Sequence, residues 1–247
     1  MVSPRRPTLR TVTVPVILVH GWGGSFASTW ERSGFVALLV DAGREVIGVD
    51  LLGHGTAPKP HDPAAYADLG ERIMDALPAG AVDAVGFSLG ALTLLRTAIA
   101  APERFHRLVL AGIGRNVFER DDAATARILA GVEGTADFAS GEAVSDYDNL
   151  ARLFGQYARI EGNDALALAA VLRRPEPGPI TPVAAARVTC PVLVALGDQD
   201  FAQPADALVD ALPDARYVTL RNTDHFATPE SLAFVDAVLD FLDAVPA

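Results

Sequence analysis

The chain has 247 residues, of which 50% are hydrophobic and 21% are charged, which suits one large globular domain with room for an inserted subdomain. Its formal net charge is −11, so the basic surface that nucleic-acid binding needs is absent, and the charge mainly favours solubility. The single cysteine cannot form a disulfide within the chain, and no apolar stretch is long enough for a signal peptide or a membrane span. We therefore expect a cytoplasmic protein without membrane or nucleic-acid partners.

The first half of the chain alternates short apolar runs with helical patterns. Strand patterns lie at 16–19, 45–49, 82–87 and 108–110, and the continuous apolar run at 16–19 is typical of a strand buried on both faces of a parallel sheet. Helical patterns lie between them, at 35–39, 62–77 and 91–100.

The pattern changes between residues 115 and 187. Three amphipathic helical patterns lie near 121–131, 142–159 and 163–173, a stretch too long for an ordinary connection between a strand and a helix. We interpret 115–187 as a helical cap inserted into a core made of 1–114 and 188–247. Its aromatic residues could pack inside the cap or line a substrate pocket. They include Phe118, Phe138, Phe154 and Tyr157.

Strand patterns resume at 191–196 and 217–220, with helical patterns at 204–211 and 229–242. About six strands that alternate with helices predict an α/β fold, in which helices cover both faces of a mostly parallel sheet.

The segment 82–91 reads V-D-A-V-G-F-S-L-G-A, an apolar run followed by a glycine-flanked serine and then by good helix formers. This order predicts a strand, a sharp turn and a helix, with Ser88 at the tip of the turn. A hydroxyl there lies at a helix N-terminus, where free N–H groups favour developing negative charge. The pentapeptide alone fits an ordinary helix cap equally well, so the rest of the chain has to decide its role.

Further polar residues follow the expected strands. Asp198 and Asp200 come after the fifth strand, and His225 comes after the sixth. Because the carboxyl ends of parallel strands meet at one edge of a sheet, we expect these residues and Ser88 at the same edge. The glycine-rich loop 20–24 follows the first strand, but it lacks the spacing of a dinucleotide or phosphate loop.

With these motifs the chain resembles the α/β-hydrolase family from about residue 16 to its end. The motifs are H-G-W-G-G (20–24), D-L-L-G-H-G-T (50–56), G-F-S-L-G (86–90), G-D-Q-D (197–200) and D-H (224–225). The insertion occupies the family's usual cap position. Two features depart from the family: the chain is too short for a full opening hairpin, and Asn222 stands where glycine is common.

The resemblance implies a serine hydrolase in which Ser88 is the nucleophile, His225 the general base and Asp200 the orienting acid. Asp198 competes for the last role, although the family pattern G-x-x-D favours Asp200. The backbone N–H groups of Trp22 and Leu89 are the implied oxyanion donors. The sequence holds no cluster with metal-ligand spacing, so we expect no metal and no cofactor.

Three functions remain open at this point. The first is hydrolysis of carboxylic esters, thioesters or lactones, with a small-molecule substrate that carries an apolar acyl group. The second is carbon–carbon bond hydrolysis or cofactor-free perhydrolysis, which resembles the first closely in motif. The third is a ligand-binding receptor or signalling module with little turnover. Epoxide hydrolysis and dehalogenation are disfavoured, because the elbow nucleophile there is aspartate and here it is Ser88.

Overall fold

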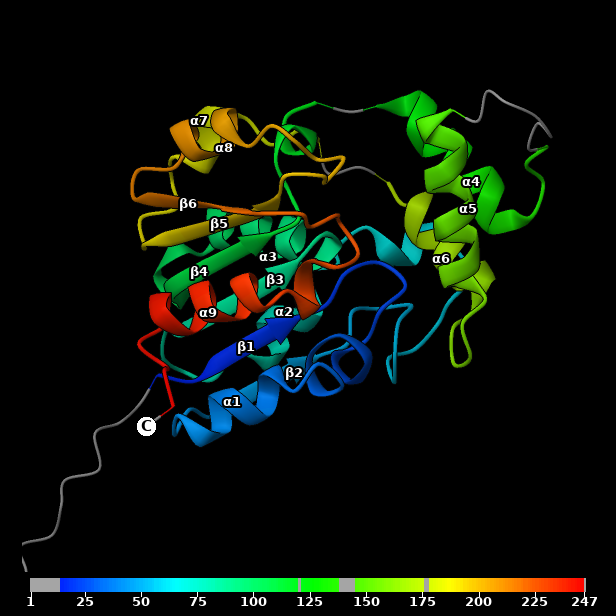
Figure 1. Ribbon diagram of the computed structural model, residues 1–247. Coiled ribbons are helices and arrows are strands. Elements are labelled where there is room, and N and C mark those ends of the chain that lie inside the picture. Colours follow the sequence, from blue (N-terminus) through cyan, green and yellow to red (C-terminus); the bar gives the residue numbers. More distant parts are fainter. Residues whose placement is uncertain (1–13, 120, 138–144, 176–177, 247) are drawn as a thin grey trace, which may run out of the picture.

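The computed structural model describes residues 14–119, 121–137, 145–175 and 178–246. Within this part of the chain, six parallel strands form one sheet in the order β2-β1-β3-β4-β5-β6 (Figure 1). The expected α/β fold with a parallel sheet is therefore confirmed. The strands are β1 (Val16–Val19), β2 (Val46–Val49), β3 (Val82–Phe87), β4 (Phe105–Ala111), β5 (Val192–Gly197) and β6 (Ala215–Leu220).

The centre of the sheet is buried on both faces, as its continuous apolar runs indicate. Every residue of β1 is buried, and successive side chains point to opposite faces of the sheet. Ile17 and Val19 join a core cluster on one face, whereas Val16 and Leu18 join a second cluster on the other. The two clusters explain why β1 has no polar position.

Helices cover both faces of the sheet (Figure 1). The cluster of Ile17 includes residues of α2 (Glu71–Ala76), α3 (Leu89–Ala100), α7 (Pro182–Ala185) and α8 (Asp206–Ala211). The cluster of Val16 includes residues of α1 (Phe35–Asp41) and α9 (Leu232–Phe241). Short helical turns complete the fold: η1 (Ala27–Glu31), η2 (Pro63–Tyr66), η3 (Pro102–Arg104), η4 (Arg115–Val117) and η5 (Thr228–Glu230).

Three further helices pack on one another beyond the carboxyl ends of the strands: α4 (Asp122–Glu133), α5 (Asp146–Ala158) and α6 (Ala165–Leu172) (Figure 1). We call these three helices and their connections the helical insertion. Each begins at a side chain that accepts first-turn N–H groups: Asp121, Ser145 and Asp164. Helices α4 and α5 approach closely at Gly131, where a Cβ would lie 2.2 Å from the carbonyl oxygen of Ala151. The later α7 packs instead with α8 and α3 of the core.

The helix expected over 62–77 is divided into η2 and α2. The Asp68 carboxylate accepts the N–H of Gly70 at 2.8 Å, and the Tyr66 hydroxyl donates to the carbonyl of Pro60 at 2.5 Å. The Asp68 bond competes with a helical one and turns the chain between the two elements. Among the aromatic residues named from the sequence, Phe138 lies outside the described residues.

A buried ion pair supports the sheet at its amino-terminal end. The guanidinium of Arg44 binds the carboxylate of Asp83 on β3, and both side chains are almost completely buried. The same guanidinium donates to the carbonyl oxygens of Val14 and Leu242, each at 2.7 Å. His106 completes the carboxylate's partners, with its Nδ1 2.8 Å from Asp83 Oδ1.

Candidate active site

The turn between β3 and α3 carries Ser88 in a backbone conformation that few residues adopt. Its φ is +52° and its ψ is −115°, so the chain reverses sharply at the serine. A Cβ at Gly90 would lie 2.4 Å from the carbonyl oxygen of His20, and one at Gly86 would lie 2.7 Å from Ala91 Cα. Gly86 therefore lets α3 start close against β3, and Gly90 lets it start close against the end of β1, which leaves the Ser88 hydroxyl at the carboxyl edge of the sheet.

Ser88, His225 and Asp200 form a continuous chain of hydrogen bonds. His225 Nε2 lies 2.9 Å from Ser88 Oγ, and its Nδ1 lies 2.9 and 3.1 Å from the two carboxylate oxygens of Asp200. A carboxylate only accepts, so Nδ1 carries the proton and Nε2 is free to accept the serine proton. The three residues follow β3, β5 and β6, so the sheet brings together positions far apart in sequence.

The two aspartates of the G-D-Q-D segment have different surroundings. Asp200 is 4% exposed and holds His225, whereas Asp198 is exposed and accepts the N–H of Thr223 at 3.3 Å. Asn222 adopts φ +51°, the left-handed region that glycine favours and that asparagine tolerates better than most residues. The residue that departs from the family pattern thus keeps the backbone conformation that glycine would give.

Aromatic rings surround the imidazole of His225. The rings of Phe201, Phe87 and Phe226 have centroids 4.3, 5.0 and 5.5 Å from it. These rings leave the histidine 4% exposed. Burial of the imidazole among these rings strengthens the electrostatic interactions that it makes. No pattern in the sequence marks these phenylalanines, although two of them directly follow Asp200 and His225.

The glycine-rich loop (residues 20–24) lies against the serine turn. A Cβ at Gly21 would approach Ser88 Cβ to 3.3 Å. The loop that carries Trp22, an expected oxyanion donor, therefore lies directly beside Ser88. Leu89 begins α3 directly after Ser88, and the first N–H groups of a helix have no partner within the helix. Both amides expected to bind an oxyanion therefore belong to segments next to Ser88.

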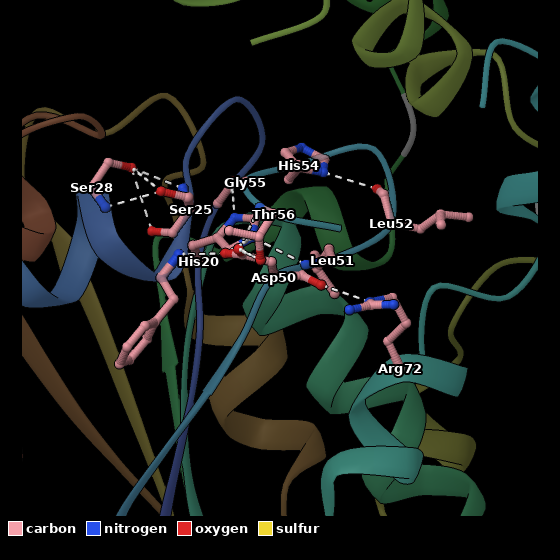
Figure 2. A network of polar contacts seen from close by, with 12 residues as sticks. His20, Ser25, Ser28, Asp50, Leu51, Leu52, His54, Gly55, Thr56 and Arg72 are labelled. Carbon is pink, nitrogen blue, oxygen red and sulfur yellow. Dashed lines mark hydrogen bonds and ion pairs between the residues drawn. The ribbon is translucent and has the colours of Figure 1, made fainter. Parts of the chain in front are cut away.

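A partly buried polar network lies beside this loop, as Figure 2 shows. The Asp50 carboxylate accepts the N–H groups of Phe26 and Thr56, each at 2.7 Å, and the Thr56 hydroxyl at 2.9 Å. Partial burial opposes ionisation of Asp50, but these hydrogen bonds outweigh it and hold the pKa of the carboxyl below its ordinary value. Asp50 therefore ties the chain after β1 to the chain after β2.

Two buried histidines flank this network. His20 donates from Nδ1 to the carbonyl of Gly21 at 2.7 Å and accepts the N–H of Leu51 at Nε2 at 3.1 Å. Burial lowers the pKa of His20, and burial lowers that of His54 to about 3. Both rings are therefore neutral near pH 7. The D-L-L-G-H-G-T motif identified this region in the sequence, but it did not predict the hydrogen bonds that Asp50 and His20 make here.

A cavity of about 1470 Å³ lies between the helical insertion and the core. His225, Phe201 and Phe226 line it from the core, and Phe118 and Leu153 are among the residues that line it from the segment after β4. Phe154 and Tyr157 pack elsewhere: the first contacts Trp22 and the second stacks on Phe226. In the described ranges, no group of three metal-ligating side chains occurs, and no helix has the length and hydropathy to cross a membrane.

Comparison with known proteins gives partial sequence matches. An esterase of Mycobacterium tuberculosis is 33% identical over 138 residues, which are 53% of this chain and 44% of that protein. A 2-hydroxy-6-oxo-2,4-heptadienoate hydrolase of Pseudomonas putida is 37% identical over 113 residues, 44% of this chain and 40% of the other. The chain thus spans less than half the length of these curated relatives.

A comparison of structures and a family model each cover most of the chain. The structure of a bromoperoxidase from Bacillus anthracis superposes with a TM-score of 0.70 at 22% identity, covering 94% of this chain and 92% of that chain, a likeness of fold. A sequence model of the alpha/beta hydrolase family matches residues 16–237. This match includes all six strands of the sheet, the serine turn and the His225 loop, and so the chain belongs to the alpha/beta hydrolase family.

Proposed function

We propose that the protein is a serine hydrolase that cleaves carboxylic esters, including thioesters and lactones, through an acyl-enzyme on Ser88. The observation that carries this proposal is the hydrogen-bonded chain from Ser88 Oγ through His225 to Asp200, with both links at 2.9 Å. A serine hydroxyl is a poor nucleophile at neutral pH, and an adjacent base whose tautomer is fixed by a carboxylate activates it.

The reaction follows from the positions of these groups. Ser88 Oγ attacks the carbonyl carbon while its proton moves to His225 Nε2, and the carbonyl oxygen becomes an oxyanion facing the Trp22 and Leu89 N–H groups. The bond to the leaving group then breaks, and His225 returns the proton to the departing oxygen or sulfur. Water repeats the sequence on the acyl-enzyme: it gives a proton to His225, releases the acid and restores the serine.

We also propose that the segment 115–187 acts as a cap, in which helices α4–α6 control access to the serine. The cavity beneath them has room for a small molecule, and apolar side chains such as Phe118, Ile128 and Leu153 form part of its wall. These side chains favour an apolar acyl group at their part of the wall, and charged side chains such as Arg115, Glu119 and Asp122 line other parts of the cavity.

A second candidate is hydrolysis of carbon–carbon bonds. It is favoured by the 37% identity to the heptadienoate hydrolase of Pseudomonas putida over 113 residues. The same serine, histidine and acid would serve that reaction, so the candidate differs from the first in the substrate and not in these groups.

One substrate panel tests both candidates. It contains p-nitrophenyl esters with acyl chains from C2 to C12, a lactone and a dienoic ketone, with Ser88→Ala as the control. Ester turnover that disappears in Ser88→Ala, together with fluorophosphonate labelling of the wild type alone, is the expected result. Turnover of the ketone without the esters would favour the second candidate, and absence of both turnover and labelling would refute both.

A further inference from the structure

Two side chains link the helical insertion to the glycine-rich loop, one from the insertion and one from the loop itself. The Asn163 amide Nδ2 donates to the carbonyl of Gly23 at 2.8 Å and to the carbonyl of Tyr157 at 2.9 Å. The Trp22 indole Nε1 donates to the carbonyl of Leu168 in α6 at 3.2 Å. An amide NH₂ has two donors, and Asn163 uses one on the loop and one on the insertion.

Side-chain packing reinforces these hydrogen bonds. The Trp22 ring lies 5.0 Å from the ring of Phe154, and a Cβ at Gly23 would lie 3.5 Å from Tyr157 Cβ. The Tyr157 ring in turn stacks on Phe226 at 5.1 Å, next to His225. The insertion thus contacts both the loop beside the serine and the loop that carries the histidine.

The glycine-rich loop needs such external support. Three of its five residues are glycine, and Gly23 has φ +73°, so the backbone has more accessible conformations than an ordinary loop. From below, His20 fixes only the carbonyl of Gly21. Within the loop the Gly24 N–H donates to the same Gly21 carbonyl at 3.1 Å. The insertion adds two bonds: Asn163 donates to the Gly23 carbonyl, and the Leu168 carbonyl accepts the Trp22 indole N–H.

We propose that Asn163 and the Trp22 indole are positioning residues, through which the helical insertion holds the Trp22 backbone N–H toward the oxyanion. The proposal rests on the proposed acyl-transfer function. Its consequence is that the insertion contributes to the rate of the chemical step as well as to substrate selection, because an oxyanion donor stabilises only when it is fixed before charge develops.

The test uses variants that remove the donors without changing the pocket. Trp22→Phe keeps an aromatic ring against Phe154 and removes the indole N–H. Asn163→Ala removes the bridging amide, and Asn163→Asp keeps its size but has no donor. Gln156→Ala, which removes an exposed amide from α5, is the matched control. Each protein is assayed with the ester that the wild type hydrolyses best, and with a trifluoromethyl ketone whose adduct on Ser88 carries an oxyanion.

Loss of a whole oxyanion donor costs about 10²–10³ in kcat, so a loosened donor should cost roughly 10- to 100-fold. We expect this loss in kcat for the Trp22 and Asn163 variants, with KM nearly unchanged and weaker ketone inhibition by a similar factor. The pH dependence should keep its midpoint, and Gln156→Ala should match the wild type.

Wild-type kcat in folded variants, or a rise in KM alone, would overturn the inference. A loss of kcat without weaker ketone inhibition would do the same, and so would loss of the fold in all three variants, because the contacts would then be merely structural. Failure of the proposed function has a different signature: the wild type itself would neither turn over the ester nor form the ketone adduct.

Discussion

The substitution Asp200→Asn examines how much the orientation of His225 contributes to turnover. Asp200 Oδ1 accepts the N–H of Ala202 at 2.8 Å, and Oδ2 makes the shorter contact to His225 Nδ1, at 2.9 Å. In the asparagine variant the carbonyl oxygen should stay on the Ala202 N–H, which needs an acceptor, and the NH₂ group should replace Oδ2. A donor would then face Nδ1, and the imidazole proton would move to Nε2.

A histidine with its proton on Nε2 cannot accept the Ser88 proton. Reversal of the tautomer in a serine protease lowers kcat about 10⁴-fold, which corresponds to about 5.5 kcal/mol in the activation free energy. We expect a loss of this order for Asp200→Asn. Asp198→Asn is the matched control, because the exposed Asp198 only accepts the N–H of Thr223 at 3.3 Å, which an asparagine carbonyl can also do.

The assay is steady-state ester hydrolysis at a pH where the wild-type rate is constant, with the rate of fluorophosphonate labelling as a second measurement. Thermal unfolding of both variants checks that the fold is retained. An Asp200→Asn enzyme within tenfold of the wild type would refute the tautomer argument. A larger loss in Asp198→Asn than in Asp200→Asn would make Asp198 the orienting acid.

Three further outcomes are expected. Phe118→Ala should shift the preferred acyl-chain length measured by kcat/KM while Ser88 still reacts with fluorophosphonate, and an unchanged profile would exclude this wall of the cavity as the selective element. Arg44→Ala should lower the free energy of unfolding in urea by about 3–5 kcal/mol, because it leaves the Asp83 carboxylate without its guanidinium. Arg107→Ala, which removes a surface pair, should cost less than about 1 kcal/mol, and equal costs would contradict this reasoning. Because the pKa of His54 falls from 6.5 to about 3 on folding, the unfolded chain binds the extra proton between these pH values. Stability should therefore decline from pH 6.5 to pH 4, less steeply in His54→Gln, and equal slopes would show that His54 titrates normally.

The sequence predicted the central strands well because burial on both faces demands continuous apolar runs. Strand β1 has the predicted bounds for this reason, and β3 has them although it contains the buried Asp83. Strand β4 begins at Phe105, three residues before its apolar run, because His106 and Arg107 are polar but pair with carboxylates in their neighbourhood. A search for apolar runs cannot assign a polar residue to a strand when the partner of that residue lies elsewhere in the chain.

In the candidate site, too, some features could be predicted from the sequence and others could not. Ser88, Asp200 and His225 could be placed at one edge, because the ends of parallel strands meet there. Their catalytic roles stay predictions that the experiments above test. The bridge from Asn163 to Gly23 could not be foreseen, since it joins positions 140 residues apart through a loop side chain without a local pattern. The cavity wall was foreseen only in part: Phe118 lines it, whereas Phe154 and Tyr157 support other rings.

The contacts of the Arg44 guanidinium bear on whether the order of the chain's segments could be changed. It binds carbonyl oxygens of Val14 and Leu242, so the first and last parts of the described chain meet at one side chain. These two segments lie at the amino-terminal end of the sheet, opposite the edge that carries Ser88. A short linker between them would close the backbone into a ring without approaching the serine. New ends could then be opened at an exposed loop, which would make the fold a candidate for circular permutation.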